Sequence, residues 1–262
     1  MPGTAEPQAG LELQAHAGRL ADLLHSARRV VFFGGAGVST ESGIPDFRSA
    51  GGVFRQDLPG GLSPEELVSI DCLEQQPELF FKFYREKMIF PAARPNAAHL
   101  ALARLEQDGR LCAVVTQNID GLHQMAGSRI VFELHGSIWR NYCAGCKARY
   151  DLEWLLQAAA VPHCPACGAL VRPDVVLYGE MLDDEIWQNA LRAIRQADLL
   201  IVGGTSLAVY PAAGLIRAFQ GDNLVLINRT PTAYDDNAGC IIREPIGAVL
   251  GQAVNLLFNR LP

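Results

Sequence analysis

Glycines that follow a short apolar run point to a nucleotide-binding loop near the N-terminus. Residues 30–33, VVFF, are predicted to form a buried strand, and residues 34–48 continue as GGAGVSTESGIPDFR. Such glycines let a backbone approach a pyrophosphate, and free N–H groups at a helix start attract its charge. Gly35 and Gly37 alone are a weak signal, because Thr40 stands where the dinucleotide fingerprint has its third glycine, and a structural turn explains them equally well. The Asp, Phe and Arg that end this loop favour binding, because no structural turn requires them.

Four of the seven cysteines stand in two Cys-x-x-Cys pairs, a spacing that is typical of metal ligands. The pairs are Cys143 with Cys146 and Cys164 with Cys167, and seventeen residues separate them. Four thiolates at this spacing indicate one structural Zn²⁺, because they complete a tetrahedron and leave no position for water. A redox function is the alternative, since a single Cys-x-x-Cys also occurs in thioredoxin-like proteins.

The composition is that of a globular protein with a mildly acidic surface. The 262 residues, 49% hydrophobic and 19% charged, are enough to bury a sizeable core. The net charge of −6 argues against a nucleic-acid partner and weakly favours a lysine-bearing peptide. Residues 1–10 lack the regions of a signal peptide, and no apolar run approaches the roughly 20 residues of a membrane helix. We therefore expect a cytoplasmic protein that binds neither membranes nor specific nucleic-acid sequences.

Short apolar runs alternate with amphipathic segments along most of the chain. Strands are predicted at 30–33, 111–115, 130–134, 175–178, 199–202 and 224–227, and helices at 11–27, 78–89, 96–107, 183–196 and 247–258. This alternation predicts an α/β fold with a doubly wound, Rossmann-like parallel sheet, which binds ligands beyond the carboxyl ends of its strands. Polar residues follow several of the predicted strands, namely Gln117, Asn118, Asp120, His135, Ser206 and Asn228. We expect the site at that edge of the sheet.

Taken together, the motifs resemble the signature of the sirtuins, which are NAD-dependent protein-lysine deacylases. The loop at 35–48 and the two Cys-x-x-Cys pairs match the family pattern, as do three further blocks: TQNID at 116–120, ELHG at 133–136, and GTSL at 204–207 with VYPAA at 209–213. The blocks stand in family order and span about residues 20–255. One block could arise by chance, whereas the whole ordered set makes the chain similar to this family over nearly all its length. The resemblance implies two substrates, NAD and an acyl-lysine peptide or protein.

The resemblance also implies which residues bind NAD. Carried over position by position, they are Gly35, Ala36, Gly37, Glu41, Asp46, Phe47, Arg48, Gln117, Asn118, Ile119, Asp120, Gly204, Thr205, Ser206, Asn228, Arg229 and Ile246. Asn118 and Asp120 match residues of the pocket that binds the nicotinamide amide, whose donor and acceptor both need partners. From the residues alone, Asp120 could equally be a helix N-cap. The family places Phe47 near the nicotinamide, and Arg229 and Ile246 against the adenine.

His135 is the catalytic base that the resemblance implies, and Asn118 is counted with it among the catalytic residues. An imidazole pKa of about 6.5 suits a base at neutral pH. His99 and His123 also stand at family-typical positions, but on predicted helices, where a structural role is favoured. In the implied reaction the acyl oxygen attacks C1′ of the nicotinamide ribose as nicotinamide leaves. His135 then accepts a ribose proton, the 2′-oxygen attacks the acyl carbon, and water completes the release of lysine and O-acyl-ADP-ribose.

The resemblance further implies how the acyl-lysine peptide binds. Two segments match the family strands between which the peptide adds as a third, and the predicted contacts are Val176, Tyr178, Gly179, Glu180 and Val209. Sirtuins that prefer succinyl or malonyl groups carry a Tyr and an Arg three residues apart, where this chain has Phe81 and Tyr84, with Arg85 one position off. Burying an acidic acyl chain without a counter-charge costs several kcal/mol. We therefore expect acetyl and other uncharged acyl groups, and neither desuccinylase nor demalonylase activity.

The chain is interpreted as one sirtuin catalytic domain over residues 1–262 with two lobes. The NAD-binding lobe comprises about residues 11–50, 91–136 and 175–262, and a smaller lobe is made of a helical insertion at about 51–90 and a zinc insertion at about 137–174. The active cleft would lie between the two lobes. A monomer is expected, although no motif addresses the oligomeric state.

Two other functions stay open at this point. The same intermediate could serve a mono-ADP-ribosyltransferase, and an NAD-binding sensor or scaffold without catalysis would use the same fold. The presence of Asn118, Asp120 and His135 favours the deacylase.

Overall fold

A six-stranded parallel sheet forms the centre of the molecule. The computed structural model describes residues 5–46 and 61–260, so the predicted cofactor residues Phe47 and Arg48 lie outside the described residues. The strands are β1 (Val30–Gly34), β2 (Leu111–Thr116), β3 (Val131–Glu133), β7 (Leu199–Gly203), β8 (Asn223–Ile227) and β9 (Cys240–Ile242), in the spatial order β3-β2-β1-β7-β8-β9. The order reverses at β1, in the middle of the sheet. The predicted doubly wound, Rossmann-like arrangement is therefore confirmed.

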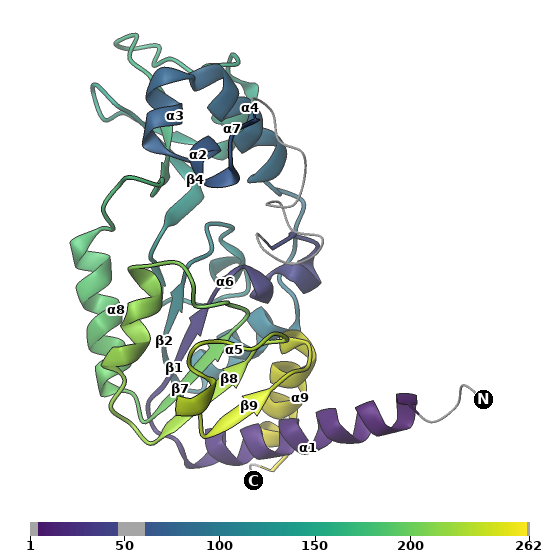
Figure 1. Cartoon of the computed structure of the whole chain (residues 1–262). Helices are drawn as coiled ribbons and strands as arrows, with labels where there is room; N and C mark the ends of the chain where they lie inside the picture. The colour runs from purple at the N-terminus through teal and green to yellow at the C-terminus, as the bar shows by residue number, and fades with distance from the viewer. Residues whose placement is uncertain (1–4, 47–60, 261–262) are drawn as a thin grey trace.

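Helices cover both faces of this sheet because its strands are apolar on both sides. In β1, Val30 and Phe32 pack into the core on one face, whereas Val31 and Phe33 pack into the core on the other. The first core is closed by α1 (Ala5–Ser26), α5 (Ala97–Gln107) and α9 (Ile246–Asn259), and the second by α8 (Asp184–Gln196) and the 3₁₀ helix η5 (Ala212–Ala218) (Figure 1). The central strands are thus buried on both faces, as their unbroken apolar runs predict.

Side-chain caps stand at several helix starts. Asn96 accepts a hydrogen bond from the backbone N–H of Ala98 at the start of α5, and Asp183 accepts one from Ile186 at the start of α8. Ser63 forms a capping box ahead of α2 (Pro64–Leu67). These side chains satisfy N–H groups that have no partner inside the helix. None of the helices in the described ranges is both long enough and apolar enough to cross a lipid bilayer.

A second, antiparallel sheet carries the cysteines and lies apart from the first. Its strands are β4 (Gly136–Cys143), β5 (Arg149–Asp151) and β6 (Val171–Val175), in the order β5-β4-β6. Helices α2, α3 (Ile70–Gln75), α4 (Pro77–Lys87) and α7 (Leu152–Gln157) share a separate hydrophobic core with it, at the top of Figure 1. Phe80, Phe83 and Leu155 lie at the centre of that core. The limits of the two lobes stay a prediction, since residues 51–60 fall outside the described ranges.

One predicted strand is wrong, and the predictions did not include β4, β5, most of β6 or β9. We expected a strand at 175–178, whereas β6 ends at Val175. The chain then turns toward the α2–α3 junction, where the N–H of Tyr178 donates to the carbonyl of Val68 and its carbonyl accepts from Ile70, both at 3.0 Å. Val175 and Leu177 of this run are buried, whereas Tyr178 is 40% exposed, and the apolar pattern does not specify which strand a segment pairs with. Strand β9, only three residues long, gave no separate signal.

Candidate active site

The strand order places the predicted site residues in a row along the carboxyl edge of the large sheet. His135 follows β3, residues 117–120 follow β2, residues 35–37 follow β1, residues 204–206 follow β7 and Asn228 follows β8. All these segments line one cleft of about 680 Å³, which residues near α2 and α4 close from the other side. Every predicted catalytic, cofactor and peptide residue that the structure describes lines this cleft. Their individual functions stay predictions.

Glycines are needed where the loops after β1 and β7 cross. The N–H of Gly37 donates to the carbonyl of Gly204 at 2.8 Å, and Gly204 has φ +59°. A Cβ atom on Gly37 would stand 2.8 Å from the Cα of Gly204, and one on Gly204 would stand 2.3 Å from the backbone nitrogen of Val38. These two glycines are therefore required by the contact of the two loops with each other, in addition to any contact with a ligand.

Other backbone amides at this crossing are available to an anion. In the described part of the chain, the N–H groups of Ala36, Thr205 and Ser206 donate to no other residue. All three residues line the cleft. We expected the backbone of Ala36 and Gly37 to meet a diphosphate. Because the N–H of Gly37 is already used, the amide of Ala36 and those after β7 are the better donors.

Asp120 belongs to a buried polar network rather than to a simple helix cap. Its Oδ2 accepts from the hydroxyl of Ser39 at 2.6 Å, and its Oδ1 accepts from the N–H of Leu122 at 2.9 Å, ahead of α6 (Leu122–Met125). The Asn118 amide donates to the same Ser39 hydroxyl at 3.1 Å. Burial raises the pKa of Asp120, and the bonds from Ser39 and Leu122 oppose this. Ser39 was not assigned from the sequence, although it lies in the glycine motif, because its partner is 81 residues away.

The ring of His135 is oriented by a backbone carbonyl. Its Nδ1 lies 3.0 Å from the carbonyl oxygen of Gln117. A carbonyl only accepts, so Nδ1 carries the hydrogen and Nε2 keeps its lone pair. Burial lowers the pKa of His135, and the bond to Gln117 partly offsets this. The Gln117 side chain donates to the hydroxyl of Thr205 at 3.1 Å. The imidazole is therefore neutral at pH 7 and can accept a proton at Nε2.

Gly136 allows the chain to pass from β3 into the second sheet directly after this histidine. It has φ +77°, and a Cβ atom there would lie 2.0 Å from the carbonyl oxygen of Asp174. A glycine is therefore required at this position by the close contact between β4 and β6.

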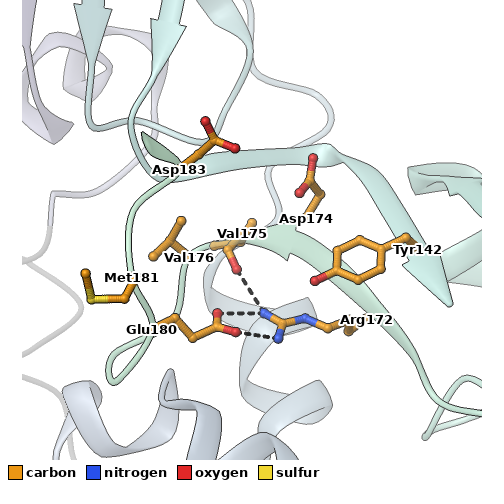
Figure 2. A pocket seen from close by; sticks show the side chains of 8 residues that line it. All are labelled: Tyr142, Arg172, Asp174, Val175, Val176, Glu180, Met181 and Asp183. Carbon is orange, nitrogen blue, oxygen red and sulfur yellow. Dashed lines mark hydrogen bonds and ion pairs between the residues drawn. The ribbon is translucent and has the colours of Figure 1, made fainter. Parts of the chain in front are cut away.

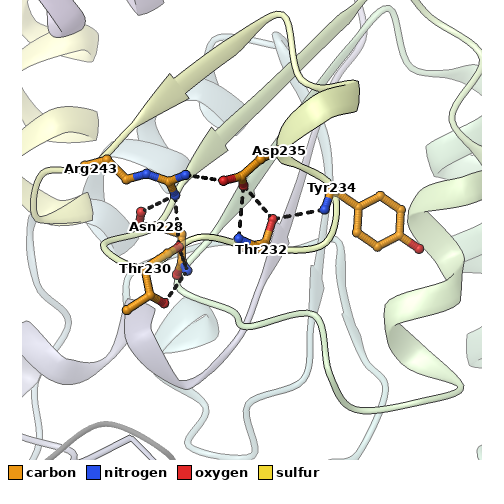
Figure 3. Close-up of polar contacts among 6 residues, drawn as sticks. All are labelled: Asn228, Thr230, Thr232, Tyr234, Asp235 and Arg243. Carbon is orange, nitrogen blue, oxygen red and sulfur yellow. Dashed lines mark hydrogen bonds and ion pairs between the residues drawn. The ribbon is translucent and has the colours of Figure 1, made fainter.

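The far end of the cleft, after β8, is held by an arginine network (Figure 3). The Asn228 amide donates to the carbonyl of Thr230 at 2.8 Å. Arg243 donates to the carbonyls of Asn228 and Thr230, both at 2.9 Å, and pairs with Asp235. These contacts hold the guanidinium of Arg243 against the loop that follows β8. Arg229 lines the cleft and is exposed, whereas Ile246, at the start of α9, is buried against it.

The predicted peptide segment after β6 is braced by an ion pair (Figure 2). Arg172, 8% exposed, donates to both oxygens of Glu180 at 2.6 and 2.8 Å, and to the carbonyl of Val175 at 3.1 Å. Glu180 also accepts from the N–H of Leu177 at 2.9 Å. The carboxylate of Glu180 therefore stabilises the shape of residues 175–180. No pattern in the sequence predicts a function for Arg172, because that function depends on the turn that follows β6.

The side of the cleft beside α4 is lined by one cationic side chain and by aromatic and apolar ones, namely Tyr84, Lys87, Met88 and Phe90. Tyr84 lines it, whereas Phe81 is buried in the core outside it. Arg85 donates to three carbonyls at the end of α7, from Leu155, Ala159 and Ala160, so its charge is used away from the cleft. Lys87, for which the sequence predicted no function, is the cation among the residues that line this side.

The four cysteines converge at the end of the small sheet. Their Sγ atoms all lie within 4.8 Å of one another, with 3.3 Å between Cys143 and Cys167 and 3.6 Å between Cys146 and Cys164. Four Zn–S bonds of about 2.3 Å in a tetrahedron place sulfurs about 3.8 Å apart, so the cluster fits one structural zinc ion. Bound Zn²⁺ would join the two loops through four thiolates and leave no coordination position for water.

Comparison with known proteins agrees with this arrangement. The model of the Sir2 family matches residues 35–211. A protein of Clostridium perfringens named NAD-dependent protein deacetylase is 56% identical over 238 residues, which is 90% of this chain and 98% of that protein. A second, from Clostridium acetobutylicum, has the same name and is 56% identical over 88% of this chain and 95% of its own length. A solved structure of Sir2 with a p53 peptide and NAD⁺ superposes with a TM-score of 0.79 at 39% identity, covering 91% of this chain and 97% of that one. The chain therefore belongs to the Sir2 family.

Proposed function

We propose that this protein is an NAD-dependent protein-lysine deacetylase that transfers the acyl group of acyl-lysine to ADP-ribose and releases nicotinamide. The observation that carries the proposal is the position of His135, a neutral imidazole with its Nδ1 bound to the carbonyl of Gln117. It lines the same cleft as the Asn118–Ser39–Asp120 network and the amides after β1 and β7. The relatives named NAD-dependent protein deacetylase support the same activity.

The segments along the carboxyl edge of the large sheet have separate functions in this reaction. Amides of Ala36, Thr205 and Ser206 bind the diphosphate, and Asn228 lies at the adenosine end. Asn118 and Asp120 bind the carboxamide of nicotinamide, one as donor and one as acceptor. Nε2 of His135 accepts a proton from a ribose hydroxyl, so that the 2′-oxygen can attack the acyl carbon. No side chain forms a covalent bond to substrate.

The peptide substrate binds between residues 175–180 and 207–211 through main-chain contacts, which favours broad sequence specificity. We propose acetyl and other uncharged acyl groups, because Tyr84 stands beside the cleft and Arg85 is directed elsewhere. A Sir2 structure with a propionylated peptide is among the similar structures. We also propose a monomer in the cytoplasm, where the four zinc-ligand thiols stay reduced.

The test is to incubate the protein with an acetyl-lysine peptide and NAD, and to measure nicotinamide release and the change in mass of the peptide. His135→Ala should lose activity by about two to four orders of magnitude while keeping NAD binding. His25→Ala, a change of an exposed histidine at the end of α1, is the matched control. Nicotinamide release without peptide would indicate an NAD hydrolase, and transfer of label from NAD to protein would indicate the mono-ADP-ribosyltransferase. If the folded wild type bound NAD but did not turn it over, the protein would instead be an NAD-binding sensor or scaffold.

A further inference from the structure

The loop that carries Asp120 is attached to the small sheet by the side chain of Trp139. The indole Nε1–H donates to the carbonyl oxygen of Asp120 at 2.7 Å. Trp139 lies in β4, and 36% of its surface is exposed. A second bond runs beside the first, because the backbone N–H of Ile138 donates to the carbonyl of Ile119 at 3.0 Å. Two consecutive carbonyls of the loop are therefore held by two consecutive residues of β4.

Gly121 leaves the space that this indole occupies. A Cβ atom on Gly121 would lie 2.6 Å from Nε1 and 2.7 Å from Cδ1 of Trp139, and Gly121 has φ +74°. A side chain at that position would displace the ring from the carbonyl of Asp120. The short hydrogen bond and the requirement for a glycine show that the indole packs directly on the loop, although one of its sides faces solvent.

Asp120 is held at three atoms by three different parts of the fold. Its Oδ2 accepts from Ser39 in the loop after β1, its Oδ1 accepts from the N–H of Leu122 in α6, and its carbonyl accepts from Trp139 in β4. The first two bonds fix the direction of the carboxylate, whereas the indole fixes the backbone from which the carboxylate extends. Asp120 lines the cleft and Trp139 does not. The indole therefore acts on the cleft through Asp120.

We propose that Trp139 is a positioning residue for the nicotinamide pocket, and that it determines how tightly nicotinamide binds by holding the backbone of Asp120. This inference rests on the proposed function, because that function assigns the Asp120 carboxylate to the carboxamide of nicotinamide. An acceptor that is fixed before the ligand arrives binds it more tightly than one that must first be ordered. Without the indole N–H the carboxylate keeps Ser39 and Leu122 as partners, so nicotinamide binding is weakened rather than lost.

The test measures nicotinamide exchange. The protein is incubated with NAD, an acetyl-lysine peptide and isotopically labelled nicotinamide, and the label that enters NAD reports reversal of the step in which nicotinamide leaves. Trp139→Phe keeps an aromatic ring and removes the N–H donor. The nicotinamide concentration for half-maximal exchange should rise about threefold to tenfold, the range expected for one hydrogen bond. The KM for the peptide should be unchanged, because Trp139 does not contact the segment after β6.

A double variant distinguishes an effect through Asp120 from a general loss of order. Asp120→Asn removes the charged acceptor that the indole positions. Adding Trp139→Phe to Asp120→Asn should therefore raise the half-maximal nicotinamide concentration by a much smaller factor than Trp139→Phe does in the wild type. The melting temperature of each variant shows whether it is folded.

Trp187→Phe is the matched control, because Trp187 lies on α8, packs against the core on one face of the large sheet and is outside the cleft. Its half-maximal nicotinamide concentration should equal that of the wild type. An unchanged concentration in folded Trp139→Phe would overturn the inference, as would an equal factor in the wild-type and Asp120→Asn backgrounds. If the wild type exchanged no nicotinamide in the presence of peptide, the proposed function itself would fail, which is a different result.

Discussion

Replacing Arg172 by Gln should weaken peptide binding without a comparable effect on NAD. The guanidinium makes two bonds to Glu180 and one to the carbonyl of Val175, and it is nearly fully buried. Removing one partner of a buried ion pair costs about 3–5 kcal/mol. Glu180 is 24% exposed, so water compensates part of the loss and we expect about 2–3 kcal/mol. That cost is concentrated in residues 175–180, which are the predicted peptide contact.

The assay is steady-state deacetylation of an acetyl-lysine peptide, with each substrate varied in turn. The KM for the peptide should rise by at least tenfold, because every 1.4 kcal/mol is about a factor of ten, while the KM for NAD stays within about threefold. The double variant Arg172→Gln with Glu180→Gln should recover part of the loss, because it leaves no unpaired charge. Arg110→Gln removes an ion pair with Asp108 outside the cleft and controls for the loss of charge. Equal increases in both KM values, or no rescue in the double variant, would refute the reasoning.

Three further predictions concern the metal, the polar network and acid stability. Removing zinc with a chelator should lower the melting temperature and abolish activity, and unchanged melting of a verified zinc-free sample would contradict the structural assignment of the four cysteines. Asp120→Asn should reduce kcat/KM by about 10–100-fold, because one charge-assisted bond worth about 1.5–3 kcal/mol is lost, and activity equal to wild type would remove Asp120 from the site. Burial lowers the pKa of His99 from 6.5 to about 4. Because this folded-state pKa lies below the unfolded value, the free energy of unfolding is unaffected by His99 above pH 6.5 and decreases as the pH falls from 6.5 toward 4. The decrease due to His99 is at most about 3 kcal/mol. Denaturant titrations at pH 7 and pH 5 should show a smaller loss for His99→Gln than for the wild type, and an equal loss would assign the acid sensitivity elsewhere.

The positions of His99 and His123 distinguish them from His135. Both stand on helices and are buried, with ring centroids 4.7 Å apart. Composition could not distinguish them from His135, but position could, because His135 follows a strand at the carboxyl edge. The expectation of a structural role for the first two agrees with their burial.

The contacts that could not be predicted from the sequence join residues that lie far apart along the chain or on the two sides of a turn. Ser39 meets Asp120 across 81 positions, and Glu41 meets Gly247 across 206. Glu41 was assigned to the cofactor by resemblance alone, whereas the structure shows its carboxylate held by a helix N-terminus. The strand expected at 175–178 was wrong for a related reason, because an apolar run has the same pattern whether it pairs in a sheet or turns toward a helix.

The sequence by itself determined what depends on neighbours within a few residues. The helices at 96–107 and 183–196, the buried strands of the large sheet and the cysteine pairs are local patterns, and the order of the motifs was sufficient for the family. Only the tertiary structure decided which nitrogen of His135 is free, which glycines exist for the crossing of two loops, and which arginines are committed to the protein. The crossing of the two loops depends on the strand order of the sheet, which places β7 beside β1. The arginine contacts depend on how the chain turns after β6 and β8, because Arg172 and Arg243 each pair with a carboxylate eight positions away, and no local sequence pattern specifies those turns.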